Sequence, residues 1–202
     1  MAAKGIETLQ YPMDYAEAMR LVEILYNKKE WQKCMYVLIA ITTGFRMKDI
    51  LHITWEKFNR FNNSVTIKES KTGKVRTVRI DKNAWSILKE CKANIGFPNT
   101  EYLFKSPAKE KPMTSSWVNK FLKITIRKNN IKSKTTASHT LRKTFVLRIY
   151  LRAKQDGDID AILRLIDILG HDELSTLLRY LCIPNTTLDK YTDNMFTLNI
   201  AA

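Results

Sequence analysis

An unbroken apolar segment, residues 34–40, limits more than any other feature how this chain can fold. It is too short to cross a bilayer, which takes a helix of about 20 apolar residues. The segment lies in a helical stretch, residues 30–43, that Gly44 is expected to end. A helix that is apolar on every side has to be covered on every side, so we expect it at the centre of a core. A chain of 202 residues is long enough to bury one.

Capping residues and periodic patterns predict the elements around this helix. Asp14 and Glu17 form a capping-box pattern for a helix that runs to about residue 26. The residues expected to be buried on it are Ala16, Met19, Val22 and Leu25. Two alternating segments, 64–68 and 75–80, flank Thr72-Gly73 and predict a β-hairpin with a basic tip. Further helices are expected just after residue 46 and at about 81–93, 114–128, 138–154, 158–169, 173–181 and 188–196, with a brief strand at 101–104. The expected fold is mainly α with a small antiparallel β-sheet.

The charge of the chain is strongly positive and unevenly distributed. Thirty-four Lys and Arg against 20 Asp and Glu leave a net charge of +14. Residues 111–155 hold twelve Lys or Arg and no acidic residue, and a second basic stretch, residues 68–79, is opposed only by Glu69. A solvated surface normally mixes both signs, so these two segments indicate contact with phosphates.

The cysteines and the N-terminus point to a cytoplasmic protein. Cys34, Cys91 and Cys182 lack the spacing of metal ligands and fit reduced thiols. The first ten residues, MAAKGIETLQ, contain no apolar stretch of the kind that a secretory signal needs. Nothing in the sequence suggests a metal or nucleotide site, so we expect no cofactor and no membrane contact.

Three basic residues have side chains that could bind a phosphate, and two of them are neighbours on one expected helix. His139 and Arg142 are three positions apart, so on a helix they share a face. Ser138 as N-cap would place both in the first turn, where backbone N–H groups also favour an anion. Arg46 follows a Thr-Thr-Gly-Phe turn, and Asp49, three residues later, is expected to pair with its guanidinium.

Three further residues could supply the acid, a hydrogen-bond donor and the nucleophile for cutting a phosphodiester. Lys71 lies beside the hairpin tip, with Lys74 as a rival for the same role. His171 follows a Leu-Gly helix stop, and Tyr180 lies nine positions later on the next expected helix. Taken singly, such residues are more often a solvated lysine, an incidental histidine and a half-buried tyrosine. Tyr191 is a second candidate nucleophile that chemistry alone does not exclude.

In their order and local strings, these residues resemble the catalytic domain of the tyrosine recombinases, the phage integrase family, over nearly the whole chain. The family pattern is an Arg after a Thr-Gly turn, a Lys on a β-hairpin, and then H-x-x-R, L-G-H and Tyr. The matching positions are Arg46, Lys71, His139, Arg142, His171 and Tyr180. The nine-residue step from the last histidine favours Tyr180 over Tyr191. Lys143 replaces a frequent His in the string H-x-L-R-H, a departure that is not expected to touch the chemistry.

The resemblance implies a site-specific DNA recombinase, encoded by a bacterium, a phage or another mobile element, that needs neither metal nor ATP. Tyr180 would attack phosphorus to give a 3′-phosphotyrosyl enzyme, while Lys71 protonates the departing 5′-oxygen and His139 assists proton transfer at the nucleophile. The donors to the phosphate oxygens would be Arg46, Arg142 and His171. The residues expected to contact double-stranded DNA are Lys74, Arg76, Lys134 and Lys143.

We expect one catalytic domain over residues 1–202, with residues 1–12 as an N-terminal extension or linker. Family members usually carry a separate DNA-clamping domain, so the chain is expected to be either a catalytic fragment or a short recombinase of the kind that inverts promoter switches. Residues 185–202 resemble the C-terminal segment that docks on a neighbouring protomer, which implies self-association on DNA, as a tetramer in the recombination synapse.

Three other functions remain open from the sequence. A type IB topoisomerase uses a very similar constellation, although the L-G-H string and the compact size favour a recombinase. A DNA-binding protein without activity would bind DNA in a salt-sensitive way but form no covalent product. A basic RNA-binding domain would explain the charge and leave the ordered constellation as coincidence.

Overall fold

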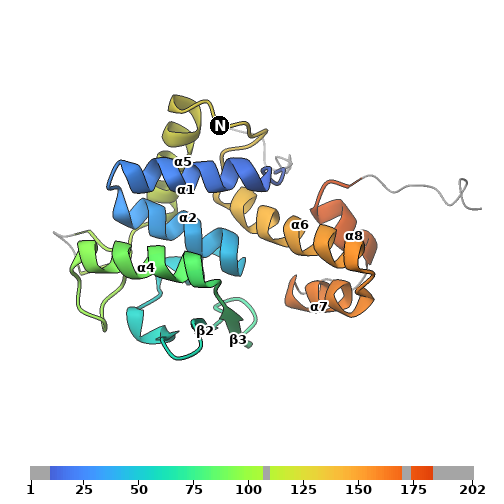
Figure 1. The fold of residues 1–202 in the computed structure, drawn as a ribbon, viewed down its shortest axis with the longest axis horizontal. Helices are drawn as coiled ribbons and strands as arrows, with labels where there is room; N and C mark the ends of the chain where they lie inside the picture. Colours follow the sequence, from blue (N-terminus) through green and yellow to red (C-terminus); the bar gives the residue numbers. More distant parts are fainter. Residues whose placement is uncertain (1–9, 107–109, 170–173, 184–202) are drawn as a thin grey trace, which may run out of the picture.

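The computed structural model describes residues 10–106, 110–169 and 174–183, which form a mainly helical fold with one small antiparallel sheet (Figure 1). The expected fold class is therefore confirmed. The helices are α1 (Tyr15–Asn27), α2 (Trp31–Thr43), α3 (Met47–Leu51), α4 (Lys82–Ile95), α5 (Ser115–Lys128), α6 (Ser138–Asp156), α7 (Ile159–Leu169) and α8 (Leu174–Tyr180). A 3-10 turn, Trp55–Lys57, precedes the strands β1 (Phe58–Asn59), β2 (Ser64–Lys68) and β3 (Val75–Arg79).

The predicted central helix is α2. Every residue of this helix from Cys34 to Ile41 is buried, and α1, α4 and α6 pack around it (Figure 1). Its end is also as predicted, because Gly44 has φ +61° and its N–H donates to the carbonyl of Ala40. This left-handed conformation is one that glycine adopts readily and other residues rarely adopt.

The start of α1 is as predicted, whereas its buried face is not. Asp14 caps the helix by accepting hydrogen bonds from the backbone N–H groups of the second and third residues after it. Ala16 and Met19 are exposed, and the buried residues are Ala18, Leu21, Val22 and Leu25. A strict spacing of three drifts around a helix of 3.6 residues per turn, whereas the observed spacing of three, one and three keeps to one face.

The predicted hairpin is present, and it carries an additional short strand. The sheet order is β1-β2-β3, all antiparallel, with Thr66 opposite Thr77 and a hydrogen bond of 2.8 Å between their hydroxyl groups. The strand expected at 101–104 is wrong. That segment makes one isolated bridge, Thr54 with Tyr102, and its backbone does not continue into a ladder.

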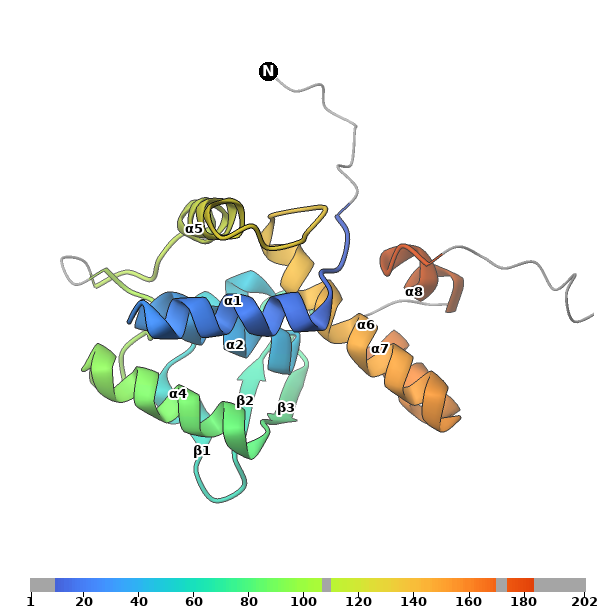
Figure 2. The same cartoon turned by 45° about the horizontal axis from the view of Figure 1, so that its top comes forward.

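The apolar residues form two clusters rather than one. The larger core joins α1–α5 and the sheet, and it continues to the first turn of α6. A smaller cluster lies between the later turns of α6 and the helices α7 and α8. Its buried members are Val146, Tyr150, Leu165, Leu169, Leu177 and Leu181. Figure 2 shows α6 leaving the main body, with α7 beside its far part.

The beginning of α6 lies one residue earlier than predicted. Ala137 occupies the N-cap position without a side-chain cap, and the N–H of Ser138 donates instead to the side-chain oxygen of Asn119 on α5 at 3.2 Å. His139 is therefore in the first turn, as expected, whereas Arg142 lies one turn further along the helix.

Candidate DNA-cleavage site

The carbonyl end of α2 holds two arginine side chains. Arg142 donates to the carbonyl oxygen of Gly44 at 2.6 Å, and Arg76 donates to that of Thr43 at 2.7 Å. The last carbonyl groups of a helix have no partner within the helix and carry partial negative charge, so they bind cations well. This contact fixes the guanidinium of Arg142, which is only 4% exposed, although α6 and α2 are far apart in sequence.

A buried carboxylate, Glu69, collects two more contacts from arginines. It lies at the end of β2, is 3% exposed, and accepts a hydrogen bond of 2.5 Å from Arg46. The Thr72 hydroxyl donates to the same oxygen at 2.8 Å, and Arg76 lies 3.6 Å from the other carboxylate oxygen. Burial acts to raise the pKa of Glu69, but these hydrogen bonds and the charges of Arg46 and Arg142 outweigh it and hold the pKa below its usual value.

The predicted pairing of Arg46 with Asp49 is wrong. The Asp49 carboxylate accepts the backbone N–H of Ser70 at 2.9 Å, and Glu69 is the acid that binds Arg46. Asp49 therefore anchors the hairpin turn to α3, while Glu69 orients the arginine. The sequence contained a signal for Glu69, which is the single acidic residue in the basic stretch 68–79. Its role was nevertheless missed.

His139 and Arg142 lie on the same face of α6, as predicted, and other cations nearby lower the pKa of both side chains. The pKa of His139 is lowered by partial desolvation and by the charges of Arg142, Lys143 and Arg46. The imidazole is exposed enough to be reached from solvent. The pKa of Arg142 is lowered by burial and by Arg46, and raised in part by Tyr180 and Glu69. A site in which buried cations depress one another's pKa is one that an anion would stabilise.

Tyr180, the last residue of α8, brings a phenol into this group of cations. Its hydroxyl oxygen is buried, and burial raises the pKa of the phenol. The nearby cations Arg142 and Arg46 act in the opposite direction. The ammonium of Lys143 lies over the Tyr180 ring, 4.6 Å from its centroid. Residues from α6, α8 and the α2–α3 junction thus meet at one place.

The other predicted residues have different surroundings. Lys71 is exposed in the turn between β2 and β3, two residues after the anchored Glu69. Lys74 is exposed and pairs with Asp167 on α7 at 2.8 Å. Lys134 lies over the ring of Tyr11 at 4.8 Å from its centroid. His171 and Tyr191 lie outside the described residues, as do residues 1–9 and 184–202, which hold most of the two predicted terminal segments.

Two residues predicted to contact DNA are buried within the site. Arg76 has a side chain only 11% exposed, and burial followed by repulsion from Arg142 lowers its pKa to about 10. Its contacts with Thr43 and Glu69 link the hairpin to the end of α2. Lys143 is 8% exposed and contacts Tyr180. Their roles in DNA binding stay predictions.

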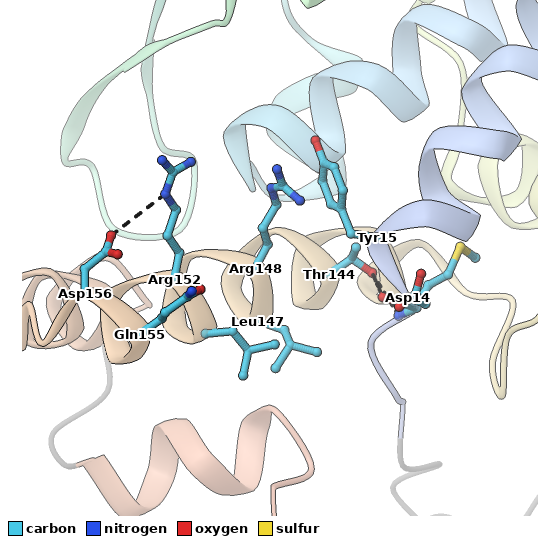
Figure 3. Close-up of a pocket in the computed structure, with 10 residues that line it drawn as sticks. Asp14, Tyr15, Thr144, Leu147, Arg148, Arg152, Gln155 and Asp156 are labelled. Carbon is cyan, nitrogen blue, oxygen red and sulfur yellow. Dashed lines mark hydrogen bonds and ion pairs between the residues drawn. The ribbon is translucent and has the colours of Figure 1, made fainter.

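A separate groove of about 510 Å³ lies on the opposite face of α6, against the start of α1 (Figure 3). Arg148 stacks on the Tyr15 ring there, 3.6 Å from its centroid, and Arg152 faces Asp156 at 3.9 Å. None of the candidate site residues lines the groove, because positions 147, 148 and 151 point away from positions 139, 142 and 146 on a helix. The candidate site is therefore not this groove. It is the group of Arg46, Arg76 and Arg142 around Glu69 and the end of α2, called the arginine cluster below, together with His139 and Tyr180.

The described part of the chain holds neither a group of metal ligands nor a membrane-spanning helix. Among those residues, no three His, Cys, Asp or Glu side chains are grouped so that they could hold a metal ion. No helix within the same ranges has the length and apolar character that a membrane span requires.

Comparison with known proteins identifies relatives of the whole described fold. Residues 12–184 match the model of the phage integrase family. The chain is 28% identical over 169 residues to the probable integrase/recombinase YoeC of Bacillus subtilis, covering 82% of this chain and 84% of that protein. It is 26% identical over 192 residues to the tyrosine recombinase XerH of Campylobacter jejuni, covering 92% of this chain and 52% of that protein. The chain thus spans about half the length of XerH.

Solved structures of recombinases share the fold. A crystal structure of XerA recombinase matches with a TM-score of 0.68 at 21% identity, over 98% of this chain and 68% of that one. XerH bound to its palindromic difH substrate in a post-cleavage complex matches with a TM-score of 0.67 at 21% identity, over 93% of this chain and 54% of that one. At this identity the likeness shows the fold, which is that of tyrosine recombinase catalytic domains. Together with the match over residues 12–184, it shows that the chain belongs to the phage integrase family.

Proposed function

We propose that this chain is a site-specific DNA recombinase that cleaves and rejoins DNA strands through a 3′-phosphotyrosyl intermediate. One observation carries the proposal, which is the meeting of Arg46, His139 and Arg142 with the buried hydroxyl of Tyr180. The relatives add support, because XerH and the Tn1549 transposon integrase are described in complexes with DNA. The net charge of +14 fits a polyanionic partner.

In the proposed reaction, the scissile phosphate lies between the two arginines. Arg46, oriented by Glu69, and Arg142, oriented by the Gly44 carbonyl, donate to the two non-bridging oxygens. Tyr180 attacks phosphorus, the bond to the 5′-oxygen breaks, and the DNA 3′-phosphate becomes bonded to the phenolic oxygen. Negative charge grows on the non-bridging oxygens in this step, and one preorganised donor at such a position is typically worth about 2.7–4 kcal/mol.

Protons have to move at both ends of the reacting group. The phenol loses its proton as it attacks, and His139 is proposed to accept it, since its lowered pKa keeps the imidazole neutral at pH 7. Lys71 is proposed to give a proton to the departing 5′-oxygen from its position on the hairpin turn. His171 is proposed as a further donor to the phosphate. A 5′-hydroxyl of another strand then attacks the phosphotyrosine and restores the phenol.

The decisive test is formation of a covalent protein–DNA adduct. Because the target sequence is unknown, the probe is a pool of nicked duplexes with a randomised core, from which adducts are isolated after denaturation and sequenced. We expect the natural chain to recover a defined sequence, and Tyr180→Phe to recover none. Tyr191→Phe is the matched control and should keep the adduct.

Each other outcome has a definite meaning. Loss of the adduct in Tyr191→Phe alone would transfer the nucleophile to Tyr191. Absence of any adduct, together with salt-sensitive retention of duplex DNA, would support a DNA-binding protein without activity. An adduct formed on nearly every sequence, with relaxation of any supercoiled plasmid, would favour a topoisomerase.

Assembly on DNA is a separate part of the proposal. We propose that the chain forms a tetramer when two DNA sites are paired, with residues 185–202 docking on a neighbouring protomer. Truncation after residue 184 should then leave binding to one half-site intact and abolish the larger complexes in analytical ultracentrifugation with DNA. Unchanged complexes after truncation would refute the docking role of this segment.

A further inference from the structure

Lys143 occupies a place that is unusual for a lysine. It follows Arg142 on α6, yet its side chain is only 8% exposed, and lysines are almost never so buried without a partner. Its ammonium lies 4.6 Å from the centroid of the Tyr180 ring and 3.9 Å from the thiol sulfur of Cys182. The ammonium therefore contacts Tyr180, the last residue of α8, and Cys182, which follows it by two residues.

A cation over an aromatic face is attracted by the negative charge of the π-system. The attraction grows when a phenol loses its proton, because the ring and its oxygen then carry a full negative charge. An ammonium fixed in this place therefore binds the phenolate more strongly than the phenol. An interaction that strengthens as the reaction proceeds is the kind that raises a rate constant rather than only improving binding.

We propose that Lys143 is a positioning residue for the nucleophile, which holds the Tyr180 ring in its orientation and favours the phenolate as the tyrosine attacks. The inference rests on the proposed role of Tyr180 and deepens it. The sequence alone suggested the opposite, since the replacement of a frequent His by Lys143 was not expected to affect the chemistry. The observed contact with the ring reverses that expectation.

The other charged groups near Tyr180 act at a different part of the side chain. Arg142 and Arg46 lower the pKa of the phenol and act near its hydroxyl, whereas Lys143 faces the ring. The Cys182 thiol, two residues after the end of α8, lies near the same ammonium. Besides Arg142 and Lys143, the basic and acidic residues on the helices around Tyr180 are His139, Arg148, Arg152, Lys154 and Asp156 on α6, Asp160, Arg164 and Asp167 on α7, and Arg179 on α8. Among them, Arg148 lies on the Tyr15 ring, Arg152 faces Asp156, and Asp167 is paired with Lys74.

The first experiment measures the ionisation of Tyr180 without DNA. The chain is labelled with 3-fluorotyrosine, whose phenol is more acidic than that of tyrosine, so that it titrates before the lysines lose their protons. The Tyr180 signal in the ¹⁹F NMR spectrum is assigned by its absence from Tyr180→Phe. We expect Lys143→Met to raise the pKa of this phenol by about one unit, as for a charge a few ångströms away in a medium of intermediate dielectric constant.

Two variants distinguish charge from packing. Lys143→Arg keeps a cation of similar length and should leave the titration of Tyr180 within a few tenths of a unit of the natural chain. Lys89→Met removes the same charge from an exposed position on α4 and should leave it unchanged. The proposal is overturned if the pKa of the Tyr180 phenol is the same in Lys143→Met as in the natural chain. It is also overturned if Lys143→Arg and Lys143→Met shift this pKa equally.

The second experiment follows DNA cleavage on a nicked duplex recovered by adduct selection, in a single turnover. Lys143→Met should lower the cleavage rate about tenfold at neutral pH, since one pKa unit corresponds to one factor of ten, and the loss should shrink as the pH rises. DNA affinity should stay within twofold if the buried ammonium acts on the Tyr180 ring, whereas a cleavage defect explained by weaker DNA binding would support the predicted DNA contact and overturn the proposal. Lys143→Arg should restore most of the rate.

Replacing the departing 5′-oxygen by sulfur separates the two lysines, because a thiolate leaves without needing a proton. This substitution should rescue Lys71→Met and should not rescue Lys143→Met. Rescue of Lys143→Met would place Lys143 at the leaving group and refute the proposal. If the natural chain forms no adduct on any duplex, the proposed function fails, whereas the ¹⁹F titration still decides whether Lys143 favours the phenolate.

Discussion

Gly44 is the position where a single methyl group should do the most damage for its size. Its φ of +61° is disfavoured for any residue with a Cβ, and a Cβ built there would lie 2.2 Å from Cδ1 of Phe145 on α6. Its carbonyl oxygen accepts the hydrogen bond from Arg142. Gly44→Ala therefore tests both how α2 ends and how closely α6 approaches it.

The expected cost has two parts. The left-handed conformation costs an alanine about 1–2 kcal/mol. Forcing an additional carbon into a packed site costs about 1–3 kcal/mol more, because the Phe145 ring or the backbone of α6 has to shift. The free energy of unfolding should thus fall by about 2–5 kcal/mol. Gly157 supplies a matched control, since its φ is +69° and a Cβ there would meet nothing within 4 Å. Gly157→Ala should show the conformational cost alone.

Urea denaturation followed by circular dichroism measures both variants on one scale, provided that the m-value is unchanged. Phe145→Ala supplies the second control. In that background the ring is absent, and Gly44→Ala should cost no more than Gly157→Ala does in the natural chain. If Gly44→Ala and Gly157→Ala destabilise the natural chain equally, the close approach of Phe145 is not energetically significant and the reasoning is refuted.

Three further predictions concern charged groups. Glu69→Gln should lower the free energy of unfolding by about 3 kcal/mol at pH 7, because it leaves buried arginines without their counter-ion, as urea denaturation would show. Because the folded-state pKa of Glu69 is lowered, its carboxylate adds to the free energy of unfolding above the unfolded pKa of 4.5, and this stabilisation is lost as the pH falls through the folded pKa. Glu69→Gln should lack this loss of stability in acid. The folded-state pKa of His139 is also lowered, so protonation of the unfolded chain should reduce stability as pH falls below 6.5, and His139→Gln should flatten the slope there. Lys74→Ala should change stability by less than about 1 kcal/mol, because its pair with Asp167 is exposed on both sides.

The elements were predictable where the deciding signal is local. Asp14, Gly44 and Asp81 act on backbone groups within a few residues of themselves, so a cap or a stop can be read directly from the sequence. The sequence of α1 offers more than one set of apolar residues, and the positions of α2 and α6 decide which set is buried. The isolated bridge at Tyr102 likewise depends on Thr54, far away in the chain.

The sequence identified candidate site residues but not the contacts that support them. Arg46, His139, Arg142 and Tyr180 were identified by their order and local strings, and the structure brings them together. The partner of Arg46 was not identified. In the sequence, Asp49 is the nearest acid, whereas in the structure the hairpin brings Glu69 into contact with Arg46. Pairing across more than twenty residues depends on the hairpin turn after β2 lying against the start of α3, where Asp49 binds the backbone N–H of Ser70, and only the fold reveals this.

The division of the apolar residues into two clusters has a consequence for dynamics. Tyr180 is held by the smaller cluster on α6, α7 and α8, and not by the core around α2. Segments with few buried contacts open with a free energy below that of global unfolding. Amide hydrogens of α8 should therefore exchange through local opening, while those of α2 exchange only when the whole chain unfolds. The tyrosine and the arginines thus belong to regions of different stability, so the end that carries the phenol can detach and return while the arginine cluster stays intact.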